Sequence, residues 1–172
     1  RDKSISIFES IALEEGKIHG CPAEDVHFHE VGAVDSIVDI VGSVLGMESL
    51  GIGEVSASSL PLGSGFVDTA HGRIPLPAPA TVALLKGIPV HDSGLKEELV
   101  TPTGAALVKG LARSFGSLPA MVIEKVGYGV GTRNLADRPN LLRILIGQEQ
   151  GPANEETVLV LESNLDDTNP EW

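Results

Sequence analysis

The chain has 172 residues, of which 42% are hydrophobic and 21% are charged, so it can bury a core and is not disordered as a whole. Twelve basic and 24 acidic residues give a net charge of −12, which excludes nucleic acid and anionic membranes as default partners. The single cysteine, Cys21, excludes an internal disulfide. Because no signal segment or apolar run of membrane-spanning length stands out, we expect a cytoplasmic protein.

The first third of the chain predicts two helices with a strand between them. Apolar residues at helical spacing predict a helix over residues 4–18. Apolar and polar side chains then alternate over residues 26–31, as in a half-buried strand that ends at Gly32. Over residues 33–50 the apolar positions recur at steps of three and four and predict the most regular helix of the chain.

The remainder of the chain mixes strands with shorter helices. Residues 54–62 are rich in strand formers, and residues 63–73 predict a glycine-bearing loop and a return strand. Pro79 is suited to the first turn of a helix that reaches Gly87, and Thr101-Pro102 begins another helix that runs to about Phe115. Three apolar strands are expected at 121–126, 141–146 and 158–161.

These elements do not follow a strict strand-helix-strand rhythm. We therefore expect an α+β fold, or an irregular α/β fold, in which a mixed sheet and its helices form a single compact domain. Residues 1–150 would make this domain, and residues 151–172 a polar linker with a first strand toward a further domain. Arg1 and the acidic, turn-like stretch before Trp172 are unlike natural boundaries, so we expect a fragment of a longer chain.

A first candidate site combines histidines and carboxylates. On a strand, His27 and His29 would project to one side, with Glu30 beside them. Asp35 and Asp39 would share one face at the start of the following helix. Two imidazoles and one or two carboxylates suit Ni²⁺, Zn²⁺ or Mn²⁺. The alternative is a pair of hydrogen-bonded surface histidines, with Asp35 stabilising the helix N-terminus.

Two further stretches could contribute ligands. In residues 64–73, His71 could supply a third nitrogen and Arg73 a contact to phosphate or carboxylate, although a solvated hairpin tip explains this loop better. Residues 162–171 hold many oxygen ligands after an apolar strand, which suits Mg²⁺ with a nucleotide or an acidic turn between domains.

A glycine-rich stretch is a candidate anion site. Gly127, Gly129 and Gly131 follow a predicted strand, so their backbone N–H groups could hold a phosphate, with Arg133 and Arg138 as charged partners. The spacing is not that of a dinucleotide-binding fingerprint. The alternative is a glycine-kinked strand packed against a neighbour.

Five blocks together resemble a known family. They are HFHEVGAVDSIVD at 27–39, the proline run at 75–81, ELVTPTGAA at 98–106, GYGVG at 127–131 and ESNLDD at 162–167. In this order they are similar to the LarC family of nickel-insertion proteins, which build the nickel-pincer nucleotide cofactor of lactate racemase.

The resemblance implies a CTP-dependent nickel chelatase, a lyase that inserts Ni²⁺ into a pyridinium mononucleotide bearing two thiocarboxylates. It implies Mg²⁺ or Mn²⁺ with CTP, lactate racemase apoprotein and further copies of the chain as partners, and a metal-handling role for this N-terminal part. His27, His29 and Glu30 become candidates for the base that removes the ring proton. Two alternatives stay open, namely a non-catalytic nickel metallochaperone or substrate-binding module, and a magnesium-dependent nucleotide hydrolase.

Overall fold

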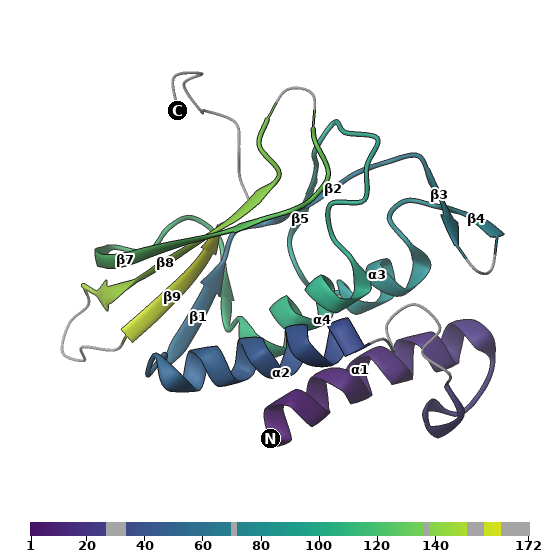
Figure 1. Cartoon of the computed structure of the whole chain (residues 1–172), viewed down its shortest axis with the longest axis horizontal. Helices are drawn as coiled ribbons and strands as arrows, with labels where there is room; N and C mark the ends of the chain where they lie inside the picture. The colour runs from purple at the N-terminus through teal and green to yellow at the C-terminus, as the bar shows by residue number, and fades with distance from the viewer. Residues whose placement is uncertain (27–33, 70–71, 136–137, 151–156, 163–172) are drawn as a thin grey trace. The chain divides into compact units, whose positions relative to one another are not determined.

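The chain combines helices with a mixed β-sheet, as Figure 1 shows for a computed structural model. The structure describes residues 1–26, 34–69, 72–135, 138–150 and 157–162. The predicted α+β class is confirmed. The chain divides into two compact units, the first made of residues 1–51 and 60–111 and the second of residues 52–59 and 112–172.

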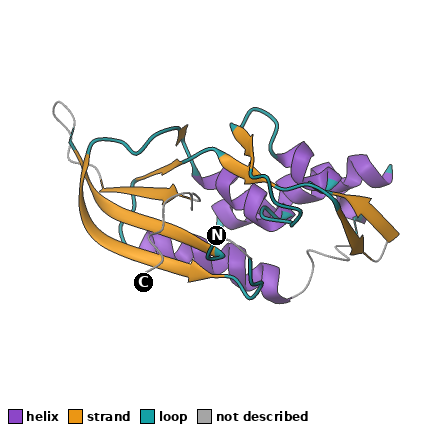
Figure 2. Ribbon diagram, turned by 90° about the horizontal axis from the view of Figure 1, so that it is seen from above, coloured by secondary structure: helices purple, strands orange, loops and turns teal. Residues whose placement is uncertain are grey.

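The first unit is built on helices. They are α1 (Asp2–His19), α2 (Val34–Ser49), α3 (Pro79–Leu84) and α4 (Pro102–Leu111), with a 3-10 turn at Ala23–Asp25. Helix α1 contacts each of the other three. Figure 2 draws the helices of the chain in purple and its strands in orange. The core of this unit consists of small and aliphatic side chains, as a sequence with only 3% aromatic residues requires, and includes Ile7, Ile11, Ile40, Val44, Leu84, Ala105 and Ala106.

The helix starts follow the sequence. Pro79 occupies the first turn of α3, where its missing N–H costs nothing. The Thr101 hydroxyl oxygen accepts a 3.2 Å hydrogen bond from the Gly104 N–H and caps α4. Helix α4 ends at Leu111 rather than at the expected Phe115. The reason is that the Arg113 N–H donates to the Val55 carbonyl, and the chain then pairs as a strand.

Two small pairs of strands complete the first unit. Strand β2 (Leu60–Leu62) runs parallel to β5 (Val90–Asp92). Strands β3 (Phe66–Thr69) and β4 (Gly72–Pro75) form the expected antiparallel hairpin.

The second unit is a five-stranded mixed sheet with the order β6-β1-β9-β8-β7. Its strands are β1 (Glu54–Ala57), β6 (Ser114–Phe115), β7 (Met121–Val130), β8 (Leu141–Glu149) and β9 (Thr157–Glu162). Strands β6, β1 and β9 are parallel, whereas β8 is antiparallel to both β9 and β7.

Strand β9 lies inside the sheet of the second unit. We expected residues 157–161 to lead away from a domain that ends at residue 150. Instead β9 is the central strand of the sheet, paired with β1 on one side and β8 on the other. Val158, Leu159 and Val160 are all buried, so both faces of this strand are covered.

Within the described residues, no helix has the length and apolar character needed to cross a membrane.

Candidate metal centre

Two of the predicted metal ligands lie at the start of α2. Asp35 is in the first turn of the helix, and Asp39 follows one turn later, so both carboxylates share a face. Both side chains are exposed. The buried residues of α2, namely Ser36, Ile40 and Val44, lie on a different side of the helix. This arrangement leaves the two carboxylates available to bind a cation from solvent.

The other predicted ligands, His27, His29 and His71, fall outside the described residues, as does the candidate base Glu30. Among the residues that are described, no group of three or more His, Cys, Asp or Glu side chains could hold a metal. The α2 carboxylates are therefore the described part of the predicted site, and two oxygen donors alone do not complete the shell of a transition metal.

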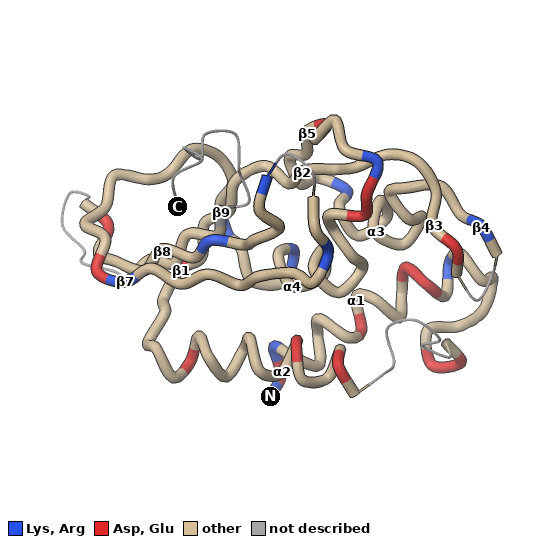
Figure 3. Tube along the Cα trace, turned by 45° about the horizontal axis from the view of Figure 1, so that its top comes forward, with Lys and Arg blue, Asp and Glu red and all other residues tan. Residues whose placement is uncertain are grey.

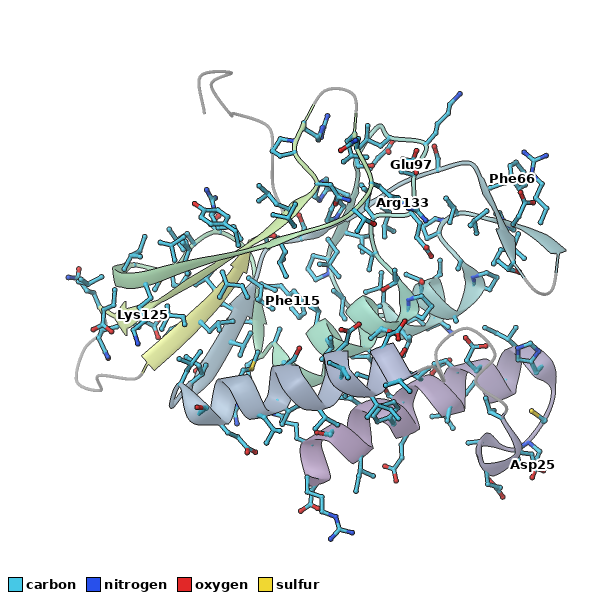
Figure 4. All side chains as sticks on the ribbon, in the orientation of Figure 1. Asp25, Phe66, Glu97, Phe115, Lys125 and Arg133 are labelled. Atoms are coloured by element: carbon cyan, nitrogen blue, oxygen red, sulfur yellow. The ribbon has the colours of Figure 1, made fainter. Side chains whose placement is uncertain are left out.

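The hairpin β3–β4 carries the segment that contains His71. Asp68 is exposed and lies opposite Arg73 in the strand register. The Arg73 guanidinium stands 4.9 Å from the centre of the Phe66 ring, a cation–π contact on β3, where Figure 4 labels Phe66. The Thr69 hydroxyl donates to the Gly72 carbonyl at 2.9 Å. These contacts fix the two strands that flank the histidine.

The glycine stretch is strand rather than loop. Gly127 and Gly129 lie within β7, opposite Ile144 and Leu142 of β8. The Gly131 N–H donates to the Asn140 carbonyl at 2.8 Å. Gly127 and Gly129 thus match the alternative of a glycine-bearing strand packed against a neighbour, because pairing with β8 continues to Val130. Gly131 follows the end of the strand.

The two arginines belong to the connection between β7 and β8. Arg133 and Arg138 lie between Gly131 and Asn140, and Figure 4 labels Arg133 after the end of β7. The Asn140 side-chain amide donates to the Arg133 carbonyl at 3.3 Å, so this asparagine holds the connection closed. The two guanidinium groups supply the positive charge of this connection.

Of the acidic run at 162–171, only Glu162 is described, as the last residue of β9. The remaining carboxylates of that run lie outside the described residues.

Sequence reasoning missed one polar cluster. Glu14 on α1 is 9% exposed, and the Lys17 ammonium donates a 2.8 Å hydrogen bond to its carboxylate. That hydrogen bond lowers the pKa of Glu14 against the opposing effect of burial, and the charges of Lys17, Lys109 and Lys86 lower it further. The spacing Glu14–Lys17 is the only signal in the sequence that could have revealed this cluster.

Comparison with known proteins assigns the chain to a family. Residues 1–172 match the family described as nickel insertion protein, so the chain belongs to this family. A relative from Syntrophobacter fumaroxidans is 54% identical over 172 residues, which are 100% of this chain and 44% of that protein. Relatives from Geotalea daltonii and Dictyoglomus thermophilum are 54% and 48% identical over 171 residues, 99% of this chain and 44% of each protein.

Each of these three relatives is named "Putative nickel insertion protein". The chain spans less than half the length of these curated relatives. No solved structure matches the chain.

Proposed function

We propose that the full-length protein inserts Ni²⁺ into a pyridinium bisthiocarboxylate mononucleotide in a CTP-dependent reaction, in the cytoplasm, and so forms the nickel-pincer cofactor of lactate racemase. The described chain carries the part that holds nickel. The observation that supports this proposal is the family match over residues 1–172, which includes the two exposed carboxylates of α2.

The proposed nickel ligands are imidazoles and carboxylates. They are His27, His29, Asp35, Asp39 and His71. Nitrogen and oxygen donors of this kind bind nickel less tightly than a ligand that offers two sulfurs. The protein would therefore bind nickel weakly enough to release it to the thiocarboxylate sulfurs of the substrate.

Formation of the nickel–carbon bond needs a base. The ring carbon loses a proton as its electron pair forms the bond to Ni²⁺, so a nearby group must accept that proton. His27, His29 and Glu30 are the proposed candidates, because they adjoin the proposed ligands in the sequence. CTP with Mg²⁺ or Mn²⁺ would be bound by the full-length protein.

The substrate phosphate is assigned to Arg133 and Arg138. Both arginines stand in one short connection whose ends are closed by Asn140. A guanidinium offers several N–H donors in a planar fork that fits phosphate oxygens. In a chain with a net charge of −12, such a local excess of positive charge is what a phosphate requires.

Calorimetric titration of Ni²⁺ into the full-length protein tests the metal site. We expect nickel affinity to fall at least about tenfold in each of two double variants, Asp35→Asn/Asp39→Asn and His27→Ala/His29→Ala. Tenfold is the smallest loss typical when a residue that only hydrogen-bonds a metal ligand is removed, so loss of the ligands themselves should cost no less. Glu48→Gln is the matched control, an exposed acid on the same helix, and should bind as the wild type does. Affinity should also fall as the pH drops through about 6.5, because a protonated imidazole has no lone pair to donate.

Two results would contradict the proposal. Equal nickel affinity in the wild type and in both double variants would remove these residues as ligands. If the full-length protein bound nickel through them but left the mononucleotide unchanged with CTP present, the non-catalytic metallochaperone would replace the chelatase.

A further inference from the structure

Strand β7 presents an aromatic ring at the edge of the sheet. It is the last strand in the order β6-β1-β9-β8-β7, and its residues from Val122 to Val130 are all exposed. Tyr128, the single tyrosine of the chain, is 62% exposed near the end of this strand. Neither its ring nor its hydroxyl makes a hydrogen bond or a ring contact with the described residues. Much of this ring is therefore accessible to a ligand.

Glycines flank this tyrosine on both sides. A Cβ added to Gly127 or Gly129 would meet nothing within 4 Å, so packing against the described residues requires neither glycine. Glycine inside a strand weakens the strand and often marks a place where a ligand or another backbone approaches closely. The backbone beside Tyr128 is thus bare at positions where strand stability alone would favour larger residues.

Positive charge gathers at the same end of the β7–β8 pair. Tyr128 lies opposite Arg143 of β8, and β7 ends two residues further on. The connection that follows carries Arg133 and Arg138. Three of the six arginines of the chain, drawn in blue with the lysines in Figure 3, thus fall within residues 133–143. All belong to one hairpin of the second unit, so the strand register alone places them at the end of the sheet where Tyr128 lies.

An aromatic ring beside an anion site suits a mononucleotide. Two residues of a strand span about 7 Å, which is the distance along β7 from Tyr128 to the end of the strand. The ribose of a mononucleotide separates its ring from its phosphate, so one ligand can reach both the tyrosine and the connection. Aromatic side chains stack on nucleotide rings, and a positively charged ring is attracted in addition to the electron-rich face of the phenol.

We infer that Tyr128 stacks on the pyridinium ring of the mononucleotide whose phosphate is assigned to Arg133 and Arg138. Arg143, half-buried and opposite Tyr128 in the register, supplies positive charge for the anionic thiocarboxylates of that ring. This inference rests on the proposed function for the identity of the ligand. It adds the residue that distinguishes a mononucleotide from a sugar phosphate, because a sugar phosphate has no ring to stack.

Calorimetry on the full-length protein with three probes tests the stacking. Nicotinate mononucleotide has a pyridinium ring and a phosphate, nicotinate riboside lacks the phosphate, and ribose 5-phosphate lacks the ring. Tyr128→Val keeps a strand-forming side chain. It should weaken binding of the mononucleotide and the riboside about 5- to 100-fold, as expected for loss of one stacked aromatic side chain, and leave ribose 5-phosphate unchanged.

Two control variants separate the ring from the strand. Tyr128→Phe keeps the aromatic ring and should bind all three probes as the wild type does. Val122→Ala changes a side chain that is 50% exposed near the other end of β7, and it should also leave all three affinities unchanged.

Two results would overturn the inference. An unchanged ratio of mononucleotide affinity to ribose 5-phosphate affinity in Tyr128→Val would show that Tyr128 does not recognise the ring. A dependence on Tyr128 for cytidine monophosphate, but not for nicotinate mononucleotide, would assign the tyrosine to CTP instead. These binding measurements need no nickel, so a failure of the protein to insert nickel would contradict the proposed function without contradicting the stacking.

Discussion

At the scale of single residues, Glu14 shows how a nearly buried carboxylate is kept charged. Lys17 lies one turn further along α1 and donates directly to it, while Lys86 follows α3 and Lys109 belongs to α4. Three lysines from different parts of the first unit thus lower the pKa of one acid in a chain that is otherwise strongly acidic. The lowered pKa of Glu14 means that folding favours its charged form.

We expect Glu14→Gln to lower the free energy of unfolding at pH 7 by about 0.5–1 kcal/mol, a small figure because Lys17 is 58% exposed and solvent screens the pair. A depressed carboxyl pKa stabilises the fold above the ordinary value of 4.5, and this stabilisation is lost as the pH falls through the lowered pKa. Urea unfolding of the two proteins between pH 7 and pH 3 measures the difference.

The difference between wild type and variant should therefore shrink below pH 4.5. Glu9→Gln, an exposed acid on the same helix, is the control and should differ little from the wild type at any pH. A gap that stays constant down to pH 3 would show that the carboxylate charge does not contribute.

At the scale of elements, the contact between α1 and α4 depends on a glycine. A Cβ on Gly110 would stand 2.6 Å from Cγ1 of Ile7, whose side chain is 1% exposed. Alanine at this position in α4 would gain helix propensity but would force the two helices apart. Because Cγ1 lies in the middle of a buried side chain, the overlap cannot be relieved by moving a free end.

Gly110→Ala should therefore destabilise the protein by about 1–2 kcal/mol, the lower part of the range for an overpacked core. The double variant Gly110→Ala/Ile7→Ala should lose less than the sum of the two single changes, because alanine at position 7 lacks the Cγ1 atom that the new methyl group would overlap. Chemical unfolding of the four proteins gives the coupling energy, and strict additivity would exclude the overlap as the cause.

The elements also show what the sequence can and cannot predict. The starts of α2, α3 and α4 follow from apolar spacing, from Pro79 and from Thr101, which are local signals. The buried side of α2 does not follow, because its apolar residues surround most of the helix and periodicity alone cannot choose between Ile40 and Val38. Tertiary contacts make that choice.

The candidate site also has parts that the sequence predicts and parts that it does not. The spacing of Asp35 and Asp39 correctly predicted that both carboxylates lie on one exposed face of α2. For the glycines at 127, 129 and 131 the sequence left open an anion-binding stretch after a strand or a glycine-kinked strand, and pairing with β8 continues the strand through the first two. Such pairing joins residues distant from one another in the sequence, and no local pattern reports it.

At the scale of the whole molecule, strand order and charge distribution matter most. The sheet brings β1 from the first half of the chain beside β9 near its end, with a register from Glu54–Val158 to Ala57–Leu161. The polar composition of 148–156 predicted a linker at this point, and it carries no sign that β9, which follows it, pairs with β1 and β8. Charge, in contrast, is read from the sequence directly, and its value of −12 disfavours every anionic ligand except where arginines gather.

Arg133 and Arg138 are therefore the residues that we expect to bind the phosphate of the proposed substrate. We expect Arg133→Ala in the full-length protein to weaken binding of a pyridinium mononucleotide by roughly 1.5–3 kcal/mol, the scale of a hydrogen bond to a charged group. The corresponding nucleoside, which lacks the phosphate, should bind wild type and variant equally.

Arg113→Ala, an exposed arginine of the same unit, is the matched control and should leave both affinities unchanged. Calorimetry with the two ligands separates loss of the phosphate contact from loss of fold, since a misfolded variant would lose the nucleoside as well. An unchanged preference for the mononucleotide in both Arg133→Ala and Arg138→Ala would leave the phosphate to another part of the protein.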